Sequence, residues 1–286
     1  MRALWELLAE RFALLSAIAS ASITLLILLF MAYMGLPAIK NAGFFQLLLS
    51  PWYPYAGMYG VLPMIVTTIR LSLLCLAFAI PLSLGCSFLI TTIAPRTVAK
   101  SLRRMIELMT GIPTVIYGFV GIFLLVPLLR EMLESGSGMC ILAAAMMLAV
   151  MISPTMTLFF CDSFDRIPRS YLNAADALGA SPIQKLFYVT LPSARAGMLN
   201  GVVLGLGRAV GDTLIALMLA GNSIDMPESM LDSARTLTAH IALVFAADYE
   251  SPEFSSIFTC GLVLYVFTTM TTLFVRYYGR GEAGRA

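Results

Sequence analysis

Long apolar stretches, separated by short polar segments, run along most of this chain. A helix needs ~20 apolar residues to cross the hydrocarbon core of a bilayer. The stretches that reach this length are Phe12–Leu36, Leu62–Ile93, Gly111–Leu133, Met139–Phe160, Ala194–Gly221 and Ser256–Tyr278. Lipid offers no partners to backbone polar groups, so runs of this kind must be helices. The pattern predicts an all-α fold, a polytopic transmembrane helical bundle of about six spans, in which residues 1–286 form a single domain.

The composition agrees with a membrane protein, since 59% of the residues are hydrophobic and only 12% are charged. The first stretch is longer than the 7–15 apolar residues of a signal peptide, and no small-residue cleavage pattern follows before Pro37. We therefore expect it to remain as a span. The chain has five cysteines without a CxxC pair and one histidine, so we expect no metal site. No basic block points to nucleic acid.

Basic residues divide unevenly between the two sides of the predicted bundle. With the amino terminus inside, the cytoplasmic segments carry Arg2, Arg11, Arg96, Lys100, Arg103, Arg104, Arg166, Arg169, Lys185, Arg195, Arg276, Arg280 and Arg285. The outer segments carry only Lys40, Arg130 and Arg235, together with an excess of acidic residues that includes Glu134 and Glu250. Because cytoplasmic loops are enriched in Lys and Arg, we expect both termini and residues 161–193 in the cytoplasm.

The polar segment 161–193 is too short for a domain and is strongly punctuated. Ser170 can cap a first helix over residues 171–178, and Gly179 can close that helix in a left-handed conformation. Ser181 can cap a second helix, with Pro182 at its first position, where no N–H is needed. Pro192 is expected to stop this second helix. The segment therefore predicts two short helices joined at a glycine, between two membrane spans.

The spacing of this segment resembles the EAA loop of ABC-importer permeases. The family pattern is Glu-Ala-Ala, three residues, Gly, nine residues and Ile-x-Leu-Pro, and here Asn173 replaces the Glu and Val189 the Ile. In that family the loop seats in a groove of the ATPase subunit. The resemblance implies that ATPase coupling falls to Asn173, Ala174, Ala175, Gly179, Leu186, Phe187, Leu191 and Pro192. The Asn173 departure removes a charge from the first helix, and with it the basis for an ion pair there.

Two ionisable residues, Arg208 and Asp212, lie within the fifth apolar stretch. Their spacing of four places them on one face of a continuous helix, within pairing reach. Such residues cost at least ~2.5–3.5 kcal/mol at mid-membrane and are functional candidates by default. A guanidinium matches an oxyanion, so the pair predicts an anion path; the alternative is a closed ion pair that fixes helix register. Arg70, in the second stretch, either joins this path or extends its side chain to the interface.

Further motifs extend the resemblance over the chain from about residue 36 onward. They are Tyr59-Gly60-Val61-Leu62-Pro63, Gly111-Ile112-Pro113-Thr114-Val115-Ile116-Tyr117-Gly118, Gly207-Arg208-Ala209-Val210-Gly211-Asp212-Thr213, Ala220-Gly221-Asn222 and Thr236-Leu237-Thr238-Ala239-His240-Ile241-Ala242-Leu243. Together they resemble phosphate-importer permeases of the Pst type, and the PstC subunit more than PstA. The resemblance implies an ABC type I importer permease fold in a bacterial inner membrane, and import of inorganic phosphate. The family usually has Glu where this chain has Asp212.

The resemblance also implies partners. These are two ATP-binding ABC subunits, a second homologous permease of the PstA kind, an extracytoplasmic phosphate-binding protein and membrane lipid. ATP and Mg²⁺ would be bound by the ATPase subunits, and this chain would be a permease without a cofactor or catalytic residues of its own. The lack of a GxxxxGK[ST] phosphate loop in the sequence agrees with that division.

Three alternatives remain open at this point. A permease for sulfate, molybdate or a phosphonate would use the same guanidinium chemistry. A secondary transporter would need an ion-coupling site and often shows inverted repeats, and neither is visible in the sequence. An intramembrane enzyme would need a nucleophile with a base or a metal site, for which a single histidine offers little.

Overall fold

A computed structural model describes the chain except for residues 1, 43, 134–135, 249–250 and 284–286. Glu134, Glu250 and Arg285, which entered the charge comparison above, therefore lie outside the described residues. The described helices that are long and apolar enough to cross a membrane are Ala9–Leu36, Leu62–Ile93, Thr114–Leu133, Ile141–Asp165 and Pro252–Leu273. These match every predicted stretch except the fifth, so the all-α transmembrane bundle is confirmed.

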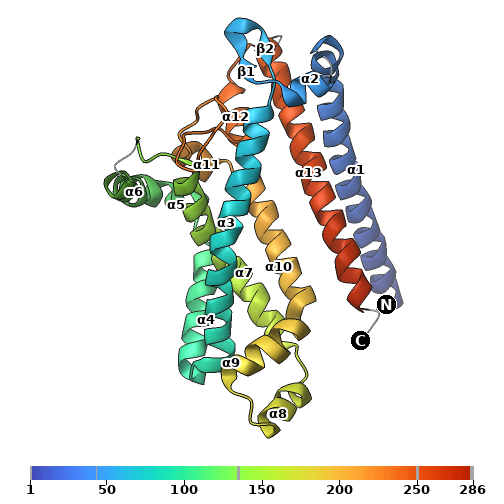
Figure 1. The fold of residues 1–286 in the computed structure, drawn as a ribbon. Helices are drawn as coiled ribbons and strands as arrows, with labels where there is room; N and C mark the ends of the chain where they lie inside the picture. Colours follow the sequence, from blue (N-terminus) through green and yellow to red (C-terminus); the bar gives the residue numbers. More distant parts are fainter. Residues whose placement is uncertain (1, 43, 134–135, 249–250, 284–286) are drawn as a thin grey trace.

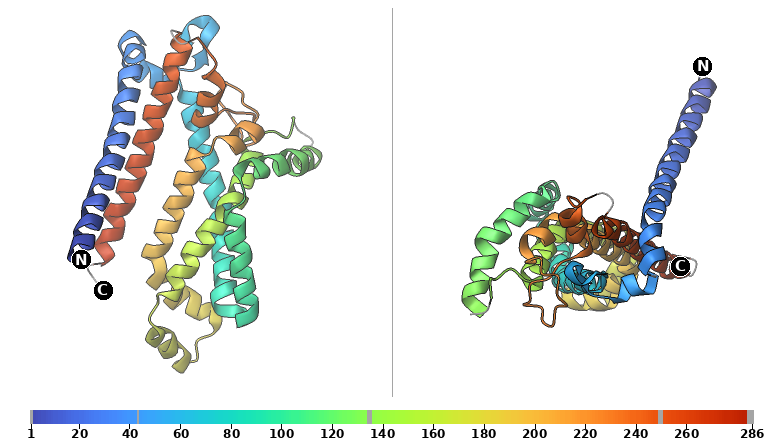
Figure 2. Two further views of the ribbon diagram at one scale, coloured as in Figure 1. Left: turned by 180° about the vertical axis from the view of Figure 1, so that it is seen from behind. Right: turned by 90° about the horizontal axis from the view of Figure 1, so that it is seen from above.

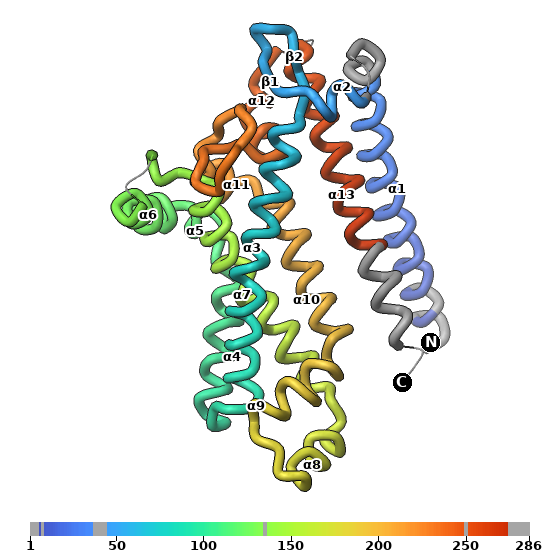
Figure 3. The backbone as a smooth tube through the Cα atoms, in the orientation of Figure 1, coloured from blue at the N-terminus to red at the C-terminus, as the bar shows by residue number. Residues whose placement is uncertain are grey.

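The two terminal helices form a pair that stands beside the rest of the bundle. Helix α1 (Arg2–Ala42) packs against α13 (Pro252–Ala283) and lies beside it in Figures 1 and 3, whereas the view from above shows α1 extending away from the bundle (Figure 2). Gly261 lets the two helices approach closely, because a Cβ there would meet the side chain of Met31. Since the apolar stretch of α1 is 0% buried, most of this helix faces outward from the chain.

Helix α7 (Ile141–Asp165) is the centre of the bundle, with 72% of its apolar stretch buried. Helices α3 (Leu62–Phe88) and α10 (Leu191–Gly211) pack against it (Figure 1). The buried core collects along this helix, including Met151, Ile152, Met156 and Phe160. A helix that is apolar on all sides is expected at such a position.

The segment between the second and third stretches is also helical. The π-helical turn η2 (Leu89–Ile93) extends α3, and α4 (Arg96–Thr110) then packs beside α7. The third span follows as α5 (Thr114–Val120), η3 (Gly121–Leu125) and α6 (Val126–Leu133), which swings away from the bundle (Figure 2). Helix α4 thus packs beside α7 with one side, although none of its residues is fully buried.

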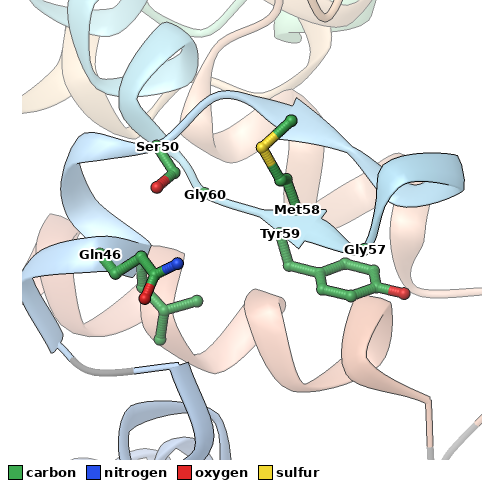
Figure 4. A pocket seen from close by; sticks show the side chains of 7 residues that line it. Gln46, Ser50, Gly57, Met58, Tyr59 and Gly60 are labelled. Carbon is green, nitrogen blue, oxygen red and sulfur yellow. The ribbon is translucent and has the colours of Figure 1, made fainter.

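We use "outer end" for the end of the molecule that carries a short β-hairpin. The hairpin pairs β1 (Trp52–Tyr53) with β2 (Met58–Tyr59), Trp52 opposite Tyr59, and η1 (Pro54–Ala56) lies between the two strands. Helix α2 (Phe44–Leu49) precedes it. Figure 4 shows a small pocket there, between Gln46 and Ser50 on one side and Met58, Tyr59 and Gly60 on the other. Gly60 has no room for a side chain, since a Cβ would overlap the Ser50 carbonyl. The hairpin therefore folds tightly onto α2.

We use "inner end" for the opposite end, which carries α8 (Arg169–Ala177) and α9 (Pro182–Lys185) (Figure 1). Helix α1 begins and α13 ends toward this same end. The start of α1, the end of α13 and the 161–193 segment thus lie toward the same end of the molecule, as the predicted topology requires. The remaining elements, η4 (Leu186–Thr190), α11 (Leu214–Leu219) and α12 (Leu237–Val244), are described with the site that they build.

Candidate functional site

The helix that carries Arg208 packs on α7 through a stripe of glycines. A Cβ at Gly201 would lie 3.0 Å from the Cβ of Phe159, and one at Gly205 would lie 2.8 Å from the sulfur of Met156. Small residues at four-residue spacing let membrane helices approach closely. The opposite face is open, since a Cβ at Gly207 or Gly211 would meet nothing within 4 Å. Helix α10 is therefore fixed on one side and unobstructed on the other.

Arg208 lies in the last turn of α10, next to the end of that glycine stripe. Its side chain is half-buried, and its Nη1 donates to the hydroxyl of Thr155 on α7 at 3.0 Å. A guanidinium has five N–H donors, so this bond to a neutral hydroxyl leaves most of its donors for another ligand. The candidate anion-binding group is thus held in position from one side by an uncharged partner.

Asp212 does not continue the helix, and here the prediction is wrong. Helix α10 ends at Gly211, and Asp212 has an extended backbone with φ −73° and ψ 129°. Its carboxylate accepts a hydrogen bond from Ile215 N at 2.8 Å, so it stabilises the start of α11. Its carbonyl accepts from the Thr238 hydroxyl at 2.8 Å. The fifth stretch is therefore two helices with a break between them, and Arg208 and Asp212 do not share one helix face.

No ion pair joins Arg208 to Asp212 among the described residues. The ion pairs that the structure shows are Arg103 with Asp162 and Asp165, and Lys185 with Asp176. Asp212 directs one carboxylate oxygen to the backbone of α11 instead. The closed pair that would fix helix register is thus absent from this part of the chain, and the charge of Arg208 is not neutralised by direct contact.

Arg70 is held at the outer end rather than at an interface with lipid. Its Nη1 donates to the carbonyl of Pro227 at 2.5 Å, in the loop between α11 and α12. The hydroxyl of Thr68, half a turn before it, accepts from Leu237 N at 3.0 Å. Helix α3 therefore holds the outer loop near its middle, at Pro227, and where it enters α12, at Leu237. The bond to Pro227 does not bring Arg70 together with Arg208. Neither Pro227 nor Thr155 could be predicted as a partner, because both are distant in sequence from the arginines that they bond.

The 161–193 segment forms the two short helices that the sequence predicts. Gly179 has a positive φ of 75°, and Ser181 caps α9 through a reciprocal pair of bonds with Gln184, at 2.8 and 3.3 Å. The Nζ of Lys185 lies 2.6 Å from Asp176, which ties α9 to α8. These local contacts make the segment a defined structure and not a loose loop.

Two details of that segment differ from the prediction. Helix α8 begins at Arg169 after Pro168, so Ser170 lies inside the helix and does not cap it. Pro192 does not end the second helix, because the π-helical turn η4 shifts the hydrogen-bond register and α10 begins at Leu191. Consequently, α9, η4 and α10 form one unbroken helical run from the inner end to Arg208.

The side chains of the predicted coupling residues divide between the surface and the interior. Ala175 and Leu186 are buried, at 8% and 6% exposed, whereas Phe187 is 59% exposed. Asn173, Ala174, Gly179 and Pro192 are exposed, and Leu191 is half-buried. Leu178 and Tyr188, which were not singled out, are 88% and 80% exposed. An exposed apolar patch of this kind marks an interaction surface.

No cluster of three or more metal-ligating side chains occurs among the described residues. Every described cysteine is unpaired, and most are buried among apolar side chains. Among the described residues the site offers guanidinium donors at Arg208 and exposed apolar side chains at the inner end.

Comparison with known proteins gives consistent results. The family described as "Binding-protein-dependent transport system inner membrane component" matches residues 79–282. The "Probable ABC transporter permease protein YqgH" of Bacillus subtilis is 39% identical over 77% of this chain and 71% of its own length. The "Phosphate transport system permease protein PstC" of Mesorhizobium japonicum is 30% identical over 84% of this chain and 79% of its own.

Solved structures with the same fold share little sequence with this chain. One is a bacterial ABC transporter involved in the import of the acidic polysaccharide alginate, with a TM-score of 0.65 at 15% identity over 97% of this chain and 98% of that one. Another is the MetNI methionine ABC transporter in an inward-facing form, with a TM-score of 0.63 at 17% identity over 79% of this chain and 97% of that one. At such identity these likenesses concern the fold alone.

Proposed function

Since this chain belongs to the family of binding-protein-dependent transport system inner membrane components, we propose that it is a permease subunit of an ATP-driven ABC importer of inorganic phosphate. Its fold is that of ABC type I importer permeases, and it is a multi-pass membrane protein. Several relatives of about 30% identity are phosphate transport permeases by name, which supports the choice of cargo.

The observation that carries this proposal is the state of Arg208. A half-buried guanidinium that is bound to one neutral hydroxyl keeps most of its N–H donors for an oxyanion. Phosphate would bind through several charge-assisted hydrogen bonds, which are roughly twice as strong as neutral ones. Asp212 would not neutralise Arg208 directly, but it would hold the break between α10 and α11 in shape and place negative charge nearby, so that the anion can leave.

Coupling to ATP would pass through the exposed patch at the inner end. We take Leu178, Phe187 and Tyr188, with Asn173 and Gly179 around them, as the surface gripped by an ATPase subunit. Movement of that subunit would push on α9, which continues through η4 into α10. This helical run, which changes direction between α9 and α10 (Figure 1), would carry the movement to Arg208. ATP and Mg²⁺ would be bound by the ATPase pair, and residues 1–286 would act as one permease domain.

The complete importer would contain two ATPase subunits, a second and distinct permease subunit of the PstA kind, and an extracytoplasmic phosphate-binding protein. Both termini would lie in the cytoplasm with the inner end. High-affinity selection of phosphate would belong to the binding protein, while this chain would conduct the anion.

The test is uptake of radiolabelled phosphate by proteoliposomes that contain this chain and its neighbouring subunits. We expect uptake that needs ATP and is unchanged by excess sulfate or molybdate. Uptake that needs ATP but is lost to sulfate or molybdate would keep the permease and replace the cargo. Uptake without ATP dependence, with all subunits present, would contradict the coupling role of α8 and α9.

A further inference from the structure

Arg235 is a second guanidinium without a carboxylate partner, in the loop between α11 and α12 at the outer end. It is half-buried, and its Nε donates to the carbonyl of Asn222 at 3.1 Å. That bond uses one of its five donors. Burial lowers the pKa of Arg235 from its ordinary value, because the charged form loses hydration. The side chain therefore remains a cation that is partly stripped of water and offers free donors.

The acidic residues of the same loop are engaged elsewhere. Asp225 accepts from the hydroxyls of Tyr53 and Ser223, at 3.1 and 3.0 Å. Asp232 accepts from the backbone N–H groups of Glu228 and Ser229, both at 2.7 Å. None of the ion pairs among the described residues involves this loop. Arg235 thus forms no ion pair among the described residues, although acidic residues are close to it in sequence.

The position of Arg235 relates it to the candidate site. The next residue, Thr236, caps α12, and its hydroxyl lies 3.1 Å from that of Thr238. Thr238 in turn donates to the Asp212 carbonyl at 2.8 Å, four residues beyond Arg208. We call these residues the polar column: Thr155, Arg208, Asp212, Thr238, Thr236 and Arg235. Beyond Thr155, it connects Arg208 to Arg235 of the outer loop through the chain and the bonds of Thr236 and Thr238.

His240 follows Thr238 by two residues in α12 but does not add a positive charge to this region. Its ring is fully buried and stands edge-on to Trp52, with centroids 4.3 Å apart. Burial, with a smaller contribution from the charge of Arg235, lowers its pKa to about 3. His240 is therefore neutral near pH 7, and the positive charges of this region belong to Arg235 and to Arg70, which bonds the same loop at Pro227.

We propose that Arg235 is an outer anion-binding station, which takes an oxyanion of the phosphate type before it reaches Arg208. The inference rests on the proposed function and adds a binding group to it. Two half-buried cations, one in the outer loop and one at the end of α10, would both attract an anion that enters from the outer end.

The experiment compares variants of the complete importer in the proteoliposome assay. Arg235→Gln removes the charge and should reduce ATP-dependent phosphate uptake about tenfold. Arg235→Lys keeps the charge but loses the bond geometry to Asn222, and its uptake should stay within about twofold of wild type. The matched control is Arg130→Gln, because Arg130 is also a predicted outer-side arginine bound to a carbonyl, that of Ser137, but lies on α6 away from the column.

A chemical rescue separates charge from structure. Arg235→Cys should regain uptake after modification with an aminoethyl thiosulfonate, which adds a cation, and not with the sulfonate reagent of similar size. Equal uptake by Arg235→Gln and Arg130→Gln would overturn the inference, as would an Arg235→Lys variant as poor as Arg235→Gln. In either case wild-type uptake of phosphate would still stand, so the proposed function would survive. A wild-type importer without phosphate uptake would remove both.

Discussion

The ion pairs among the described residues lie toward the inner end, whereas three arginines toward the outer end bond to neutral groups. At the inner end Arg103 bonds to Asp162 and Asp165, and Lys185 bonds to Asp176. Toward the outer end Arg70, Arg208 and Arg235 bond to two carbonyls and a hydroxyl, all of them neutral. Paired charges hold helices α4, α7, α8 and α9 in fixed relation. Guanidiniums without a carboxylate partner keep both their charge and N–H donors available. Folding alone does not require this.

This difference suits the two ends to different roles, namely anion passage and mechanical coupling. A buried charge without a partner carries a cost, and that cost is repaid when an anion binds. A rigid inner end transmits force without losing it to local rearrangement. We therefore propose that the arginines with neutral partners serve anion passage. The inner end, with its paired charges, would serve mechanical coupling.

The largest effect should come from removing Arg208. In Arg208→Gln an anion loses at least two charge-assisted hydrogen bonds of about 1.5–3 kcal/mol each, so we expect phosphate uptake to fall at least ~100-fold. The measurement is uptake in proteoliposomes, with subunit assembly checked by pull-down. Retained uptake would remove Arg208 from the path and leave the comparison between the two ends without its main support.

The next effect should come from charge placed on the exposed patch of the inner end. Phe187→Asp puts a carboxylate into a surface that we expect to be apolar when docked, so ATPase recovered in pull-down and uptake should both fall about tenfold. Leu186 is unsuitable because it is buried. Thr97→Asp is the control, at an exposed first-turn position of α4 where an acid is favourable. Normal ATPase recovery with Phe187→Asp would place the coupling surface elsewhere.

A smaller effect concerns the pH dependence of stability at the outer end. The folded pKa of His240 is about 3, below its unfolded value of 6.5, so the unfolded state binds more protons between these values. Stability is complete above pH 6.5 and falls as the pH drops toward 3, by at most about 1.4 kcal/mol per pH unit.

This pH effect is measurable because His240 is the one histidine of the chain. The thermal midpoint in detergent should fall between pH 7 and 5.5 for wild type and change less for His240→Asn. If both proteins lose the same stability, groups other than His240 cause the loss, and the buried neutral histidine is not part of the account.

The smallest effect should come from the ion pairs themselves. Arg103 is 33% exposed and its acidic partners are more than half exposed, so Arg103→Gln should cost about 1 kcal/mol or less. Uptake should stay within about twofold of wild type, and the thermal midpoint should shift only slightly. A loss of uptake as large as that of Arg208→Gln would break the comparison, because it would give a paired arginine a role in transport.

Much of this architecture follows from local properties of the sequence. The second span has the predicted bounds, Leu62 to Ile93, because the length of an apolar run can be counted directly along consecutive residues. Gly179 and Ser181 behave as predicted because caps depend on neighbours within one turn. Pro192 was misread because a π-helical turn before it changes the hydrogen-bond register, which a proline rule does not anticipate.

The candidate site was harder to predict because its contacts join distant residues. Thr155 precedes Arg208 by 53 positions, and Thr238 follows Asp212 by 26. One signal for the helix break was present: Gly211 followed by Asp212, with its carboxylate three residues before Ile215, is a stop followed by a cap. The neutral partners of the arginines are distant in sequence, so residue spacing could not predict that these arginines lack a carboxylate partner.

The most direct test of the account gives Arg208 the partner that it lacks. Thr155→Asp places a carboxylate where the neutral hydroxyl now accepts from Arg208, and Thr155→Asn is its neutral match in size. The measurement is ATP-dependent phosphate uptake by the two assembled importers. The account predicts that Thr155→Asp loses uptake to near background while Thr155→Asn keeps most of it. Equal uptake by both variants would show that an unpaired charge on Arg208 is not what carries the anion.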